Sequence, residues 1–580
     1  MQANVKIIST NKRIDRTAWA GAKHLLIALP KATTLPANTR LPDLDGLSLA
    51  LDRRRMKVEE LADNPIATTL ENGAIAAWVM LDFNQTRFER HTSLRKALQL
   101  FLNEYPQDIT IILSGKAELT KLVAEEAVYV CLVNRAPLPQ RKQKNLFRAL
   151  KTIYVYGQEL AHQAEIHARA DGNALARQLT QMPPNELTPL LYRKRIKQLA
   201  HEYSWKVTEY DLNELKKLGA GAFIAVAQGS STGDAAIVRV EYKGTRSGTT
   251  IALVGKGICF DTGGHNLKPA KHMQGMHEDM NGSAVVLGIL AAATRLKLPI
   301  NITAWLAIAE NHIGPMAYKQ NDVVKALNGT TIEVVHTDAE GRMVLADTLT
   351  LAAQEKPSLL IDFATLTGSM VAALGNRYSG IFSNVPELLQ QGISAGVTSG
   401  ERVWGFPMDA DYEPLLESKI ADIKQCTLEA DPDHILAARF LSRFVGKTRW
   451  LHMDLSASSC EGGLGAVASN TTGFGVDWGL AMLRNYSNSN LHWKGEQGDK
   501  DEATKQYSTA RGPRRAEQVP RGGVEATPKR CNSRRLKKRG FTHAFRGRIP
   551  KNGVPAPRAG VQDEGNAVIV FNAHWNKEIK

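Results

Sequence analysis

The chain has 580 residues, of which 43% are hydrophobic and 23% are charged. This composition supplies enough apolar residues for at least one large core, and it excludes a wholly disordered or fibrous protein. The five cysteines lie far apart and form no CxxC pair, so neither a disulfide framework nor a thiolate zinc site is predicted. We expect a cytoplasmic chain without a membrane partner. Its longest nearly charge-free stretch, around Gly282 to Thr294, is too short to cross a bilayer, and the N-terminus does not resemble a secretion signal.

The net charge of +15 is concentrated at the C-terminal end, where residues 491–580 carry 20 Lys and Arg against 9 Asp and Glu. Gly, Pro and Arg dominate this segment and apolar periodicity is weak, which predicts a disordered basic extension over residues 489–580. The run from Arg534 to Arg539 is of a kind that attracts nucleic acid, although a solvated tail without a partner has the same composition. Translation from a shifted reading frame would also explain the change in composition.

The first part of the chain alternates short apolar runs with helical patterns. This alternation predicts a small α/β domain over residues 1–165. The predicted strands are Ala22–Pro30, Ala74–Leu81 and Asp108–Leu113, and the predicted helices are Ser93–Asn103 and Lys116–Glu126.

A second and stronger α/β pattern follows a long predicted helix, Ala161–Gln181, which must end at Pro183 and Pro184. We therefore predict an α/β fold with two domains, each with a mixed or mostly parallel sheet flanked by helices, the second domain covering residues 166–488. Ligands of such sheets bind at the carboxyl ends of the strands. The predicted strands are Thr249–Val254, Asn301–Ala309, Thr331–His336 and Ser358–Phe363, and the helices are Asn281–Leu296 and Met343–Gln354.

Carboxylates collect among glycines directly after two of these strands. Asp338 and Glu340 are two residues apart, so both side chains project from the same face in extended geometry, and Asp261 and Asp279 join them at one edge of the sheet. Four such anions repel one another strongly and need cations. Hard oxygen ligands suit Mn²⁺ or Mg²⁺ and accommodate Zn²⁺. Two metal ions bridged by shared carboxylates would neutralise the cluster, and hydroxide formed on the metals would attack a polarised carbonyl.

Taken singly, these segments have ordinary interpretations. The GKG at 255–257 is not a phosphate-binding loop, because Thr250 occupies the first glycine position and Gly257 replaces Ser or Thr. A DAE triplet alone is usually the N-terminal cap of a helix. His277 and His336 alone are more often structural than metal ligands. The prediction of a metal centre therefore depends on the combination.

The segment HTDAEGRMVLADTL, which starts at His336, resembles the NTDAEGRL signature of the leucyl aminopeptidase family, and GKGICFDTGGHNLKP resembles its lysine and aspartate loop. The resemblance covers about residues 175–484. His336 stands where the signature usually has Asn, for which we expect tuned rather than lost activity. The N-terminal part is similar in size and pattern only, and the tail is not similar. Further matching segments are MPPN at 182–185, ATLTG at 364–368, WLHMD at 450–454 and TGFGV at 472–476.

The resemblance implies a metal-dependent aminopeptidase that releases N-terminal residues, with leucine-type preference, through two Mn²⁺ or Zn²⁺ ions. Lys268 would polarise the scissile carbonyl, and Arg342 would hold a bicarbonate ion that acts as general base. One metal would be held by Asp261, Asp338 and Glu340, and the other by Lys256, Asp261, Asp279 and Glu340, with Lys256 as a neutral amine. Met276, Thr365 and Gly368 would contribute to the pocket for the first side chain.

The resemblance also implies peptide substrates and a homohexamer. Two alternatives to a purely catalytic role stay open on the sequence alone. The basic tail would add nucleic-acid binding with steep salt dependence, or the chain would be an assembly protein that kept the fold without the chemistry. Against the second alternative, every expected ligand is present.

Overall fold

The computed structural model describes residues 5–493, with gaps at residues 13, 16–18, 38–40, 145–146, 246–247, 249 and 430–431, and of residues 487–493 it gives the backbone alone. The last helix, α15 (Val476–Trp493), continues past residue 488, where we placed the end of the second domain. The rest of the predicted basic extension, with the run from Arg534 to Arg539 and its proposed nucleic-acid binding, lies outside the described residues.

The N-terminal part contains a six-stranded sheet in the order β1-β6-β5-β2-β4-β3. Neighbouring strands are parallel, except that β3 and β4 are antiparallel. The strands are β1 (Lys6–Thr10), β2 (His24–Pro30), β3 (Ile66–Thr69), β4 (Ile75–Leu81), β5 (Asp108–Leu113) and β6 (Thr152–Tyr156), and the helices are α2 (Leu44–Arg54), η1 (Val58–Ala62), α3 (Arg87–Leu102) and α4 (Ala117–Val133). The α/β class predicted for this part is confirmed.

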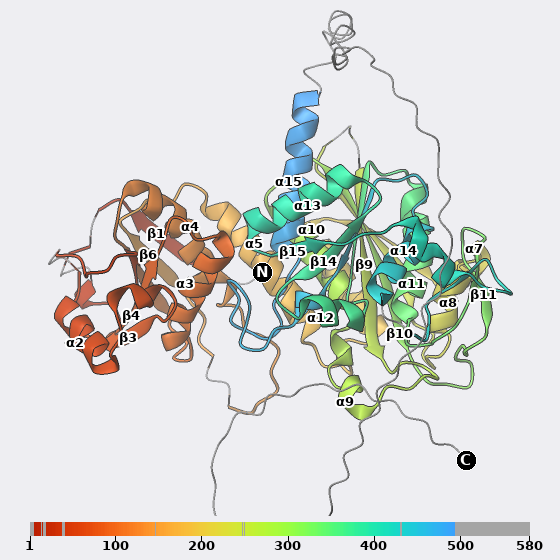
Figure 1. Ribbon diagram of the computed structural model, residues 1–580, viewed down its shortest axis with the longest axis horizontal. Helices are drawn as coiled ribbons and strands as arrows, with labels where there is room; N and C mark the ends of the chain where they lie inside the picture. The colour runs from red at the N-terminus through yellow and green to blue at the C-terminus, as the bar shows by residue number, and fades with distance from the viewer. Residues whose placement is uncertain are drawn as a thin grey trace, which may run out of the picture. The chain divides into compact units, whose positions relative to one another are not determined.

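The second part contains an eight-stranded mixed sheet in the order β15-β14-β17-β13-β9-β10-β8-β7 (Figure 1). Its centre, β17-β13-β9-β10, is parallel, and the outer pairs β14-β17, β8-β10 and β7-β8 are antiparallel. The strands are β7 (Lys206–Asp211), β8 (Ala236–Lys243), β9 (Thr250–Asp261), β10 (Asn301–Asn311), β13 (Leu359–Ala364), β14 (Ser379–Ser383), β15 (Val403–Gly405) and β17 (Trp450–Asp454).

Helices cover both faces of this sheet, and each face has its own hydrophobic core. Alternate residues of β9 divide between the two cores: Ile251 and Leu253 face one, and Ala252 and Val254 face the other. The first core includes residues of α5 (Gln163–Thr180), α6 (Pro189–Tyr203), α10 (Asn281–Arg295), α13 (Pro386–Ser399) and α15. The second includes residues of α7 (Leu212–Leu218), α8 (Gly221–Ala227), α11 (Glu340–Gln354), η3 (Ala410–Leu416) and α14 (Asp433–Ser442).

One predicted strand belongs to a different sheet from the one expected. The run from Thr331 pairs with β11 (Val323–Lys325) and β16 (Ile423–Lys424) as β12 (Thr331–Glu333) in a separate three-stranded sheet. The strand ends before His336, because the side-chain carbonyl of Gln425 accepts the backbone N–H groups of Val335 and His336. The carboxylates that follow β12 therefore reach the large sheet from this small sheet, Asp338 in the loop after β12 and Glu340 at the start of α11.

Close backbone approaches require glycine between the sheet and α10. A Cβ on Gly255 of β9 would lie 2.5 Å from the Cα of Ser283. A Cβ on Gly282 in the first turn of α10 would lie 2.1 Å from the backbone oxygen of Phe363. These contacts place the N-terminus of α10, which begins two residues after Asp279, against the middle of β9 and the end of β13.

Side chains of the N-terminal part reach the loops that precede α15. The Arg95 guanidinium donates to the backbone oxygens of Gly462 and Gly465 at 2.7 and 2.9 Å. Helix α5 packs against α4 of the first part and against α10 of the second. The boundary at residue 165 stays a prediction, since contacts between the two parts are extensive.

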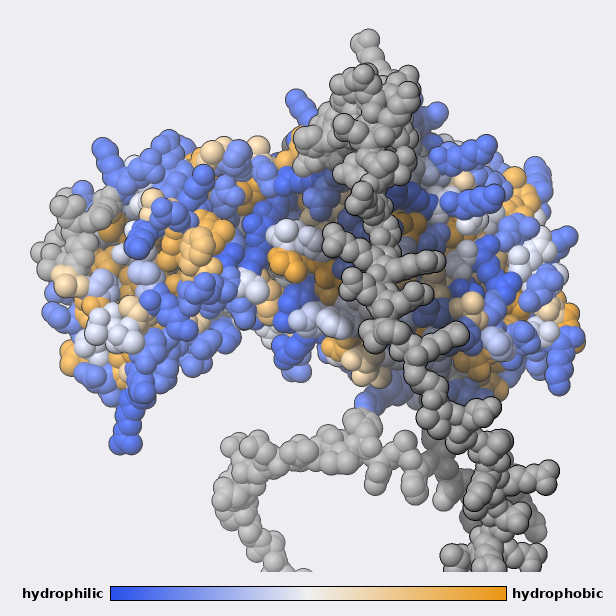
Figure 2. Space-filling view, turned by 45° about the horizontal axis from the view of Figure 1, so that its top comes forward, coloured by the Kyte–Doolittle hydropathy of each residue, from blue (hydrophilic) through white to orange (hydrophobic). Residues whose placement is uncertain are grey.

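The face drawn in Figure 2 mixes polar and apolar residues, and its hydrophobic side chains form separate patches among hydrophilic ones. Among the described residues, the structure contains no helix with the length and apolarity needed to span a membrane.

Candidate metal centre

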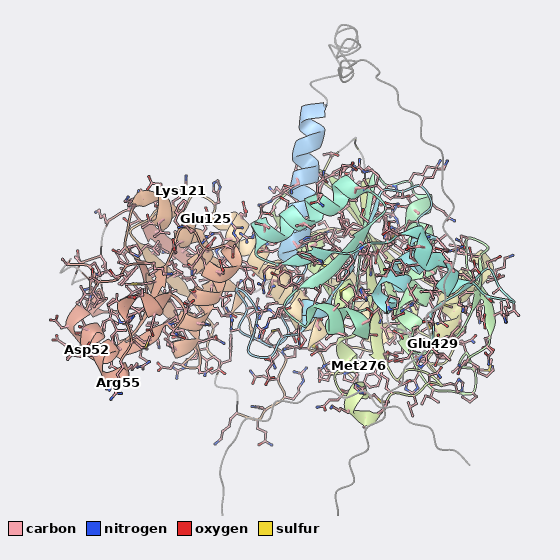
Figure 3. All side chains as sticks on the ribbon, in the orientation of Figure 1. Asp52, Arg55, Lys121, Glu125, Met276 and Glu429 are labelled. Atoms are coloured by element: carbon pink, nitrogen blue, oxygen red, sulfur yellow. The ribbon has the colours of Figure 1, made fainter. Side chains whose placement is uncertain are left out.

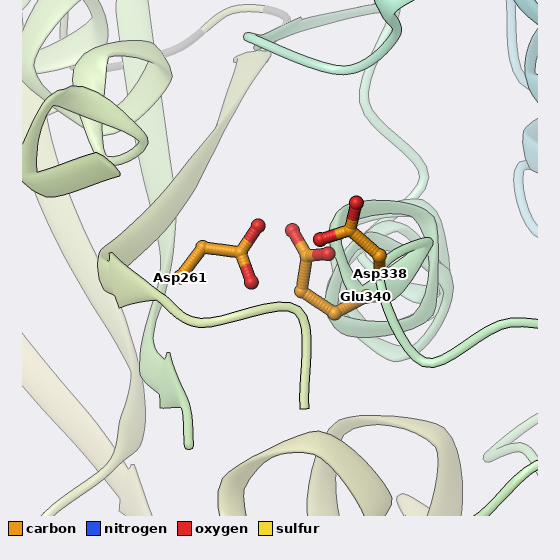
Figure 4. A group of neighbouring side chains, drawn as sticks. All are labelled: Asp261, Asp338 and Glu340. Atoms are coloured by element: carbon orange, nitrogen blue, oxygen red, sulfur yellow. The ribbon is translucent and has the colours of Figure 1, made fainter. Parts of the chain in front are cut away.

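Three carboxylates converge at the carboxyl end of β9. Asp261 is the last residue of β9, Asp338 lies in the loop after β12, and Glu340 opens α11. One oxygen from each side chain lies within 4.8 Å of the others, and Figure 4 shows the three carboxylates pointing toward one another. Asp261 and Glu340 are buried, so the three negative charges share a site with little access to water. This donor set fits a divalent cation with oxygen ligands.

Lys256 connects Asp279 to this group. Its Nζ lies 2.7 Å from Asp279 Oδ2 and 2.8 Å from Glu340 Oε1, and it donates to the backbone oxygen of Thr365 at 3.0 Å. The side chain of Thr365 also donates to Asp279, at 2.8 Å. The five side chains predicted as metal ligands therefore lie together: Lys256, Asp261, Asp279, Asp338 and Glu340.

Lys268 lies on the other side of the carboxylates. Its Nζ is 2.5 Å from Asp338 Oδ1 and 2.9 Å from Asp261 Oδ2. The backbone N–H of Lys268 donates to the backbone oxygen of Thr262, and this hydrogen bond holds the loop that carries Lys268. Lys268 is thus placed beside the carboxylates, where an ammonium can also stabilise negative charge on a bound ligand.

The electrostatics of the site follow from burial and crowding. Burial, together with the charges of Asp261 and Glu340, raises the pKa of Asp338 to about 7, against the opposing effect of Lys268. Burial also raises the pKa of Asp279 well above its ordinary value. Burial alone would lower the pKa of Lys256, but the neighbouring carboxylates outweigh it and raise that pKa. The carboxylates therefore favour a cation between them, and the neutral amine predicted for Lys256 would require divalent ions to offset their charge.

Polar neighbours fix the carboxylates, and one of them, Asn311, carries no signal in the sequence. The amide of Asn311, at the end of β10, donates to Asp261 Oδ1 at 2.8 Å and to the backbone oxygen of Thr337 at 3.0 Å. His336 accepts the backbone N–H of Asp338 through Nδ1 at 3.2 Å. A side-chain acceptor at this position therefore orders the turn that carries Asp338, and the imidazole can serve in place of the usual Asn.

Arg342 already has partners within the chain. Its Nη1 donates to the backbone oxygen of Gln425 at 2.9 Å, and its Nη2 donates to both carboxylate oxygens of Asp433, at 2.9 and 2.8 Å. Only 2% of Arg342 is exposed. An external anion would therefore meet Asp433 before it could reach the two Nη2 hydrogens.

Of the residues predicted for the side-chain pocket, Thr365 contacts a carboxylate, that of Asp279. Met276 lies in η2 (Met276–Glu278), three residues before Asp279, and Figure 3 labels it near helix α9 (Ala270–Met273). Thr365 follows β13, and Gly368 opens α12 (Gly368–Leu374). Asp454 holds the loop between them, because it accepts from the N–H of Leu366 at 3.0 Å and from the hydroxyl of Thr367 at 2.6 Å.

Comparison with known proteins identifies a matching family. The profile of the cytosol aminopeptidase family, catalytic domain, matches residues 174–478. A probable cytosol aminopeptidase of Roseiflexus castenholzii is 40% identical over 323 residues, which are 55% of this chain and 66% of the relative. Another, of Syntrophotalea carbinolica, is 43% identical over 307 residues, 53% of this chain and 61% of the relative. In both comparisons the chain thus covers less than two thirds of the relative's length.

A solved structure with the same fold is the bottromycin maturation enzyme BotP in complex with Mn. It is 29% identical to this chain, with a TM-score of 0.69, and the alignment covers 80% of this chain and all of that one. The fold and the site define an α/β protein with a carboxylate centre suited to divalent metals. By its sequence, the chain belongs to the cytosol aminopeptidase family.

Proposed function

We propose that the chain is a metal-dependent aminopeptidase, which hydrolyses the first peptide bond of a peptide. The observation that carries the proposal is the convergence of Asp261, Asp338 and Glu340 on one point, flanked by Lys256 and Lys268. Asp279, joined to Glu340 through Lys256, extends the donor set toward a second ion. Bound Mn²⁺ or Zn²⁺ would activate the attacking water and polarise the scissile carbonyl.

The chain's own residues would divide the remaining work. Lys268 is placed to stabilise the oxyanion that forms at the carbonyl carbon, because its ammonium lies beside Asp338 at the open side of the cluster. Asn311 would keep Asp261 in orientation. The loop from Thr365 to Gly368 and Met276 would contact the first side chain of the peptide. A preference for leucine-type side chains belongs to the proposal.

A homohexamer, a cytoplasmic location and peptide substrates complete the proposal, in line with the family membership. The bicarbonate ion implied for Arg342 stays a prediction.

The test is hydrolysis of a panel of amino-acid p-nitroanilides by the purified full chain with added Mn²⁺ or Zn²⁺, and again with chelator. Glu340→Ala should abolish release, since Glu340 is predicted to hold both metals. The matched control is Glu355→Ala, one residue after the other end of α11, where Glu355 pairs with Arg239 away from the centre. No release with any metal, from a folded protein, would refute the proposal.

A further inference from the structure

The guanidinium of Arg342 and the carboxylate of Asp433 form an ion pair at the metal centre that connects two segments 91 residues apart. Arg342 lies in the first turn of α11, two residues after Glu340, and Asp433 is the first residue of α14. One nitrogen, Nη2, donates to both oxygens of Asp433. Charge-assisted hydrogen bonds of this kind are among the stronger ones in proteins.

The pair is fixed from both sides. Nη1 of Arg342 donates to the backbone oxygen of Gln425, and the Gln425 side chain is itself buried against the loop that carries the carboxylates. On the side of α14, the backbone N–H of His434 donates to the hydroxyl of Ser369, at 2.8 Å, which belongs to α12. Asp433 is therefore held in place by its neighbours on two helices and is not a surface carboxylate that meets Arg342 by chance.

Asp433 is also the more accessible member of the pair. Its side chain is 18% exposed, whereas that of Arg342 is 2% exposed. An anion from solvent would have to displace Asp433 to bind the Nη2 hydrogens, and displacement would leave a carboxylate without its partner. Nε of Arg342 is buried without a hydrogen-bond partner, so a bicarbonate ion would still have to compete with Asp433 for Nη2 to bind the guanidinium through two nitrogens.

We infer that Asp433 is the resident anion of Arg342 and takes the place that the family resemblance gives to bicarbonate. This inference rests on the proposed peptidase function for its kinetic consequence. Asp433 acts as a positioning residue, because it orients the guanidinium of Arg342, which lies two residues after Glu340 in α11. Turnover by this chain is then independent of bicarbonate, and removal of the Asp433 carboxylate creates a site for an external anion.

Binding provides the first test and needs no catalytic activity. Titration of the full chain with ¹³C-bicarbonate, followed by NMR or calorimetry, should give no saturable binding to the wild type and saturable binding to Asp433→Ala. The double variant Arg342→Met with Asp433→Ala should lose that binding, which would locate the anion on Arg342. Equal binding to the wild type and to Asp433→Ala would overturn the inference, and so would no binding to Asp433→Ala.

Kinetics provide the second test, in buffer stripped of carbon dioxide. Asp433→Ala should lose at least roughly tenfold in kcat, since misplacement of a group at a reaction site can cost about 10²-fold. Bicarbonate or formate should restore most of the loss, because either anion would again hold the guanidinium in place. The wild type and the control Asp411→Ala, an exposed acidic residue of η3, should not respond to either anion. If Asp433 had a structural role only, Asp433→Ala would have a lower kcat that neither bicarbonate nor formate restores. That result would contradict the inference.

If Asp433→Ala does not fold, Asp433→Ser, which also shortens the side chain and leaves room for an anion, serves for both measurements. A wild type stimulated by bicarbonate would refute the inference while leaving the peptidase proposal intact. A wild type that hydrolyses no substrate would refute the peptidase proposal, and the binding measurement would still decide the role of Asp433.

Discussion

The side-chain amide of Asn311 donates to Asp261 Oδ1 at 2.8 Å, which fixes the carboxylate predicted to bridge both metals. Asn311 is fully buried at the end of β10, so the bond is shielded from bulk water. Hydrogen bonds to metal ligands typically account for about 10- to 100-fold in metal affinity. We therefore expect Asn311→Ala to weaken Mn²⁺ binding by that factor, measured by competition with a fluorescent chelator.

The control for this prediction is Asn328→Ala. Asn328 lies in the turn between β11 and β12 and donates only to the backbone oxygen of Arg443, away from the centre. An unchanged Mn²⁺ affinity in Asn311→Ala, in a protein with native stability, would show that Asp261 needs no orientation by Asn311.

Removal of the charge of Lys256 should destabilise the protein when divalent ions are chelated. Its Nζ is buried between Asp279 and Glu340. Loss of one partner of a buried ion pair typically costs about 3–5 kcal/mol. We expect Lys256→Met to lower the unfolding free energy by that order in chelator, and added Mn²⁺ to recover part of the loss, because metal ions offset the same carboxylates.

Chemical denaturation with and without Mn²⁺ measures this effect. Lys217→Met, on an exposed position of α7, is the matched control and should be close to neutral. If Lys256→Met had wild-type stability in chelator, the carboxylates would have to be neutral in the fold.

The ligand residues could be predicted because the signal for them is local. Asp261, Asp338 and Glu340 follow or begin regular elements, and the strand-helix alternation indicates which edge they share. The apolar runs of β2, β4 and β5 are similarly local, and their predicted bounds agree with the structure to within two residues.

The partners of these ligands could not be predicted in the same way. Asp433 meets Arg342 across 91 residues, and Gln425 meets Val335 across 90, through loops without periodicity. Strand β1 was missed because KIIST is short and has only one fully buried residue. Spacing along the chain carries no information on such contacts, which depend on the packing of α14 and β16 against the centre.

Stability should depend on pH through Asp347, a fully buried residue of α11. Its carboxylate accepts the backbone N–H groups of Phe223 and Leu327, at 2.8 and 2.7 Å. Burial raises the pKa of Asp347 from 3.8 to about 6, although these hydrogen bonds act in the opposite direction. Below about pH 4 the Asp347 carboxyl is protonated in both the folded and the unfolded chain. The unfolding free energy then has its largest value with respect to this group.

As the pH rises from about 4 to 6, Asp347 ionises in the unfolded chain first, so the unfolding free energy falls, by on the order of 3 kcal/mol. Above pH 6 the group is ionised in both states and the contribution no longer changes. Asp347→Asn cannot ionise and should lack this fall. Urea denaturation at several pH values between 4 and 7 measures the difference, and parallel curves for the two proteins would contradict the assignment.

The packing of α5 against α10 should depend on two facing glycines. A Cβ on Gly288 of α10 would lie 2.6 Å from the backbone oxygen of Gly172 in α5, and a Cβ on Gly172 would lie 2.6 Å from that of Gly288. Backbone atoms cannot move aside as side chains do, so Gly288→Ala must separate the helices. Overpacking of this kind typically costs about 1–3 kcal/mol, and thermal unfolding should show a lower Tm.

Gly21→Ala is the control, because a Cβ at Gly21 meets no atom within 4 Å. That substitution should be neutral or slightly stabilising, since alanine reduces the entropy of the unfolded chain. Because α10 begins two residues after Asp279, separation of the helices should also reduce Mn²⁺ affinity in Gly288→Ala. A variant with lower Tm and unchanged Mn²⁺ affinity would show that the N-terminus of α10 is held by its contacts with β9 and β13 alone.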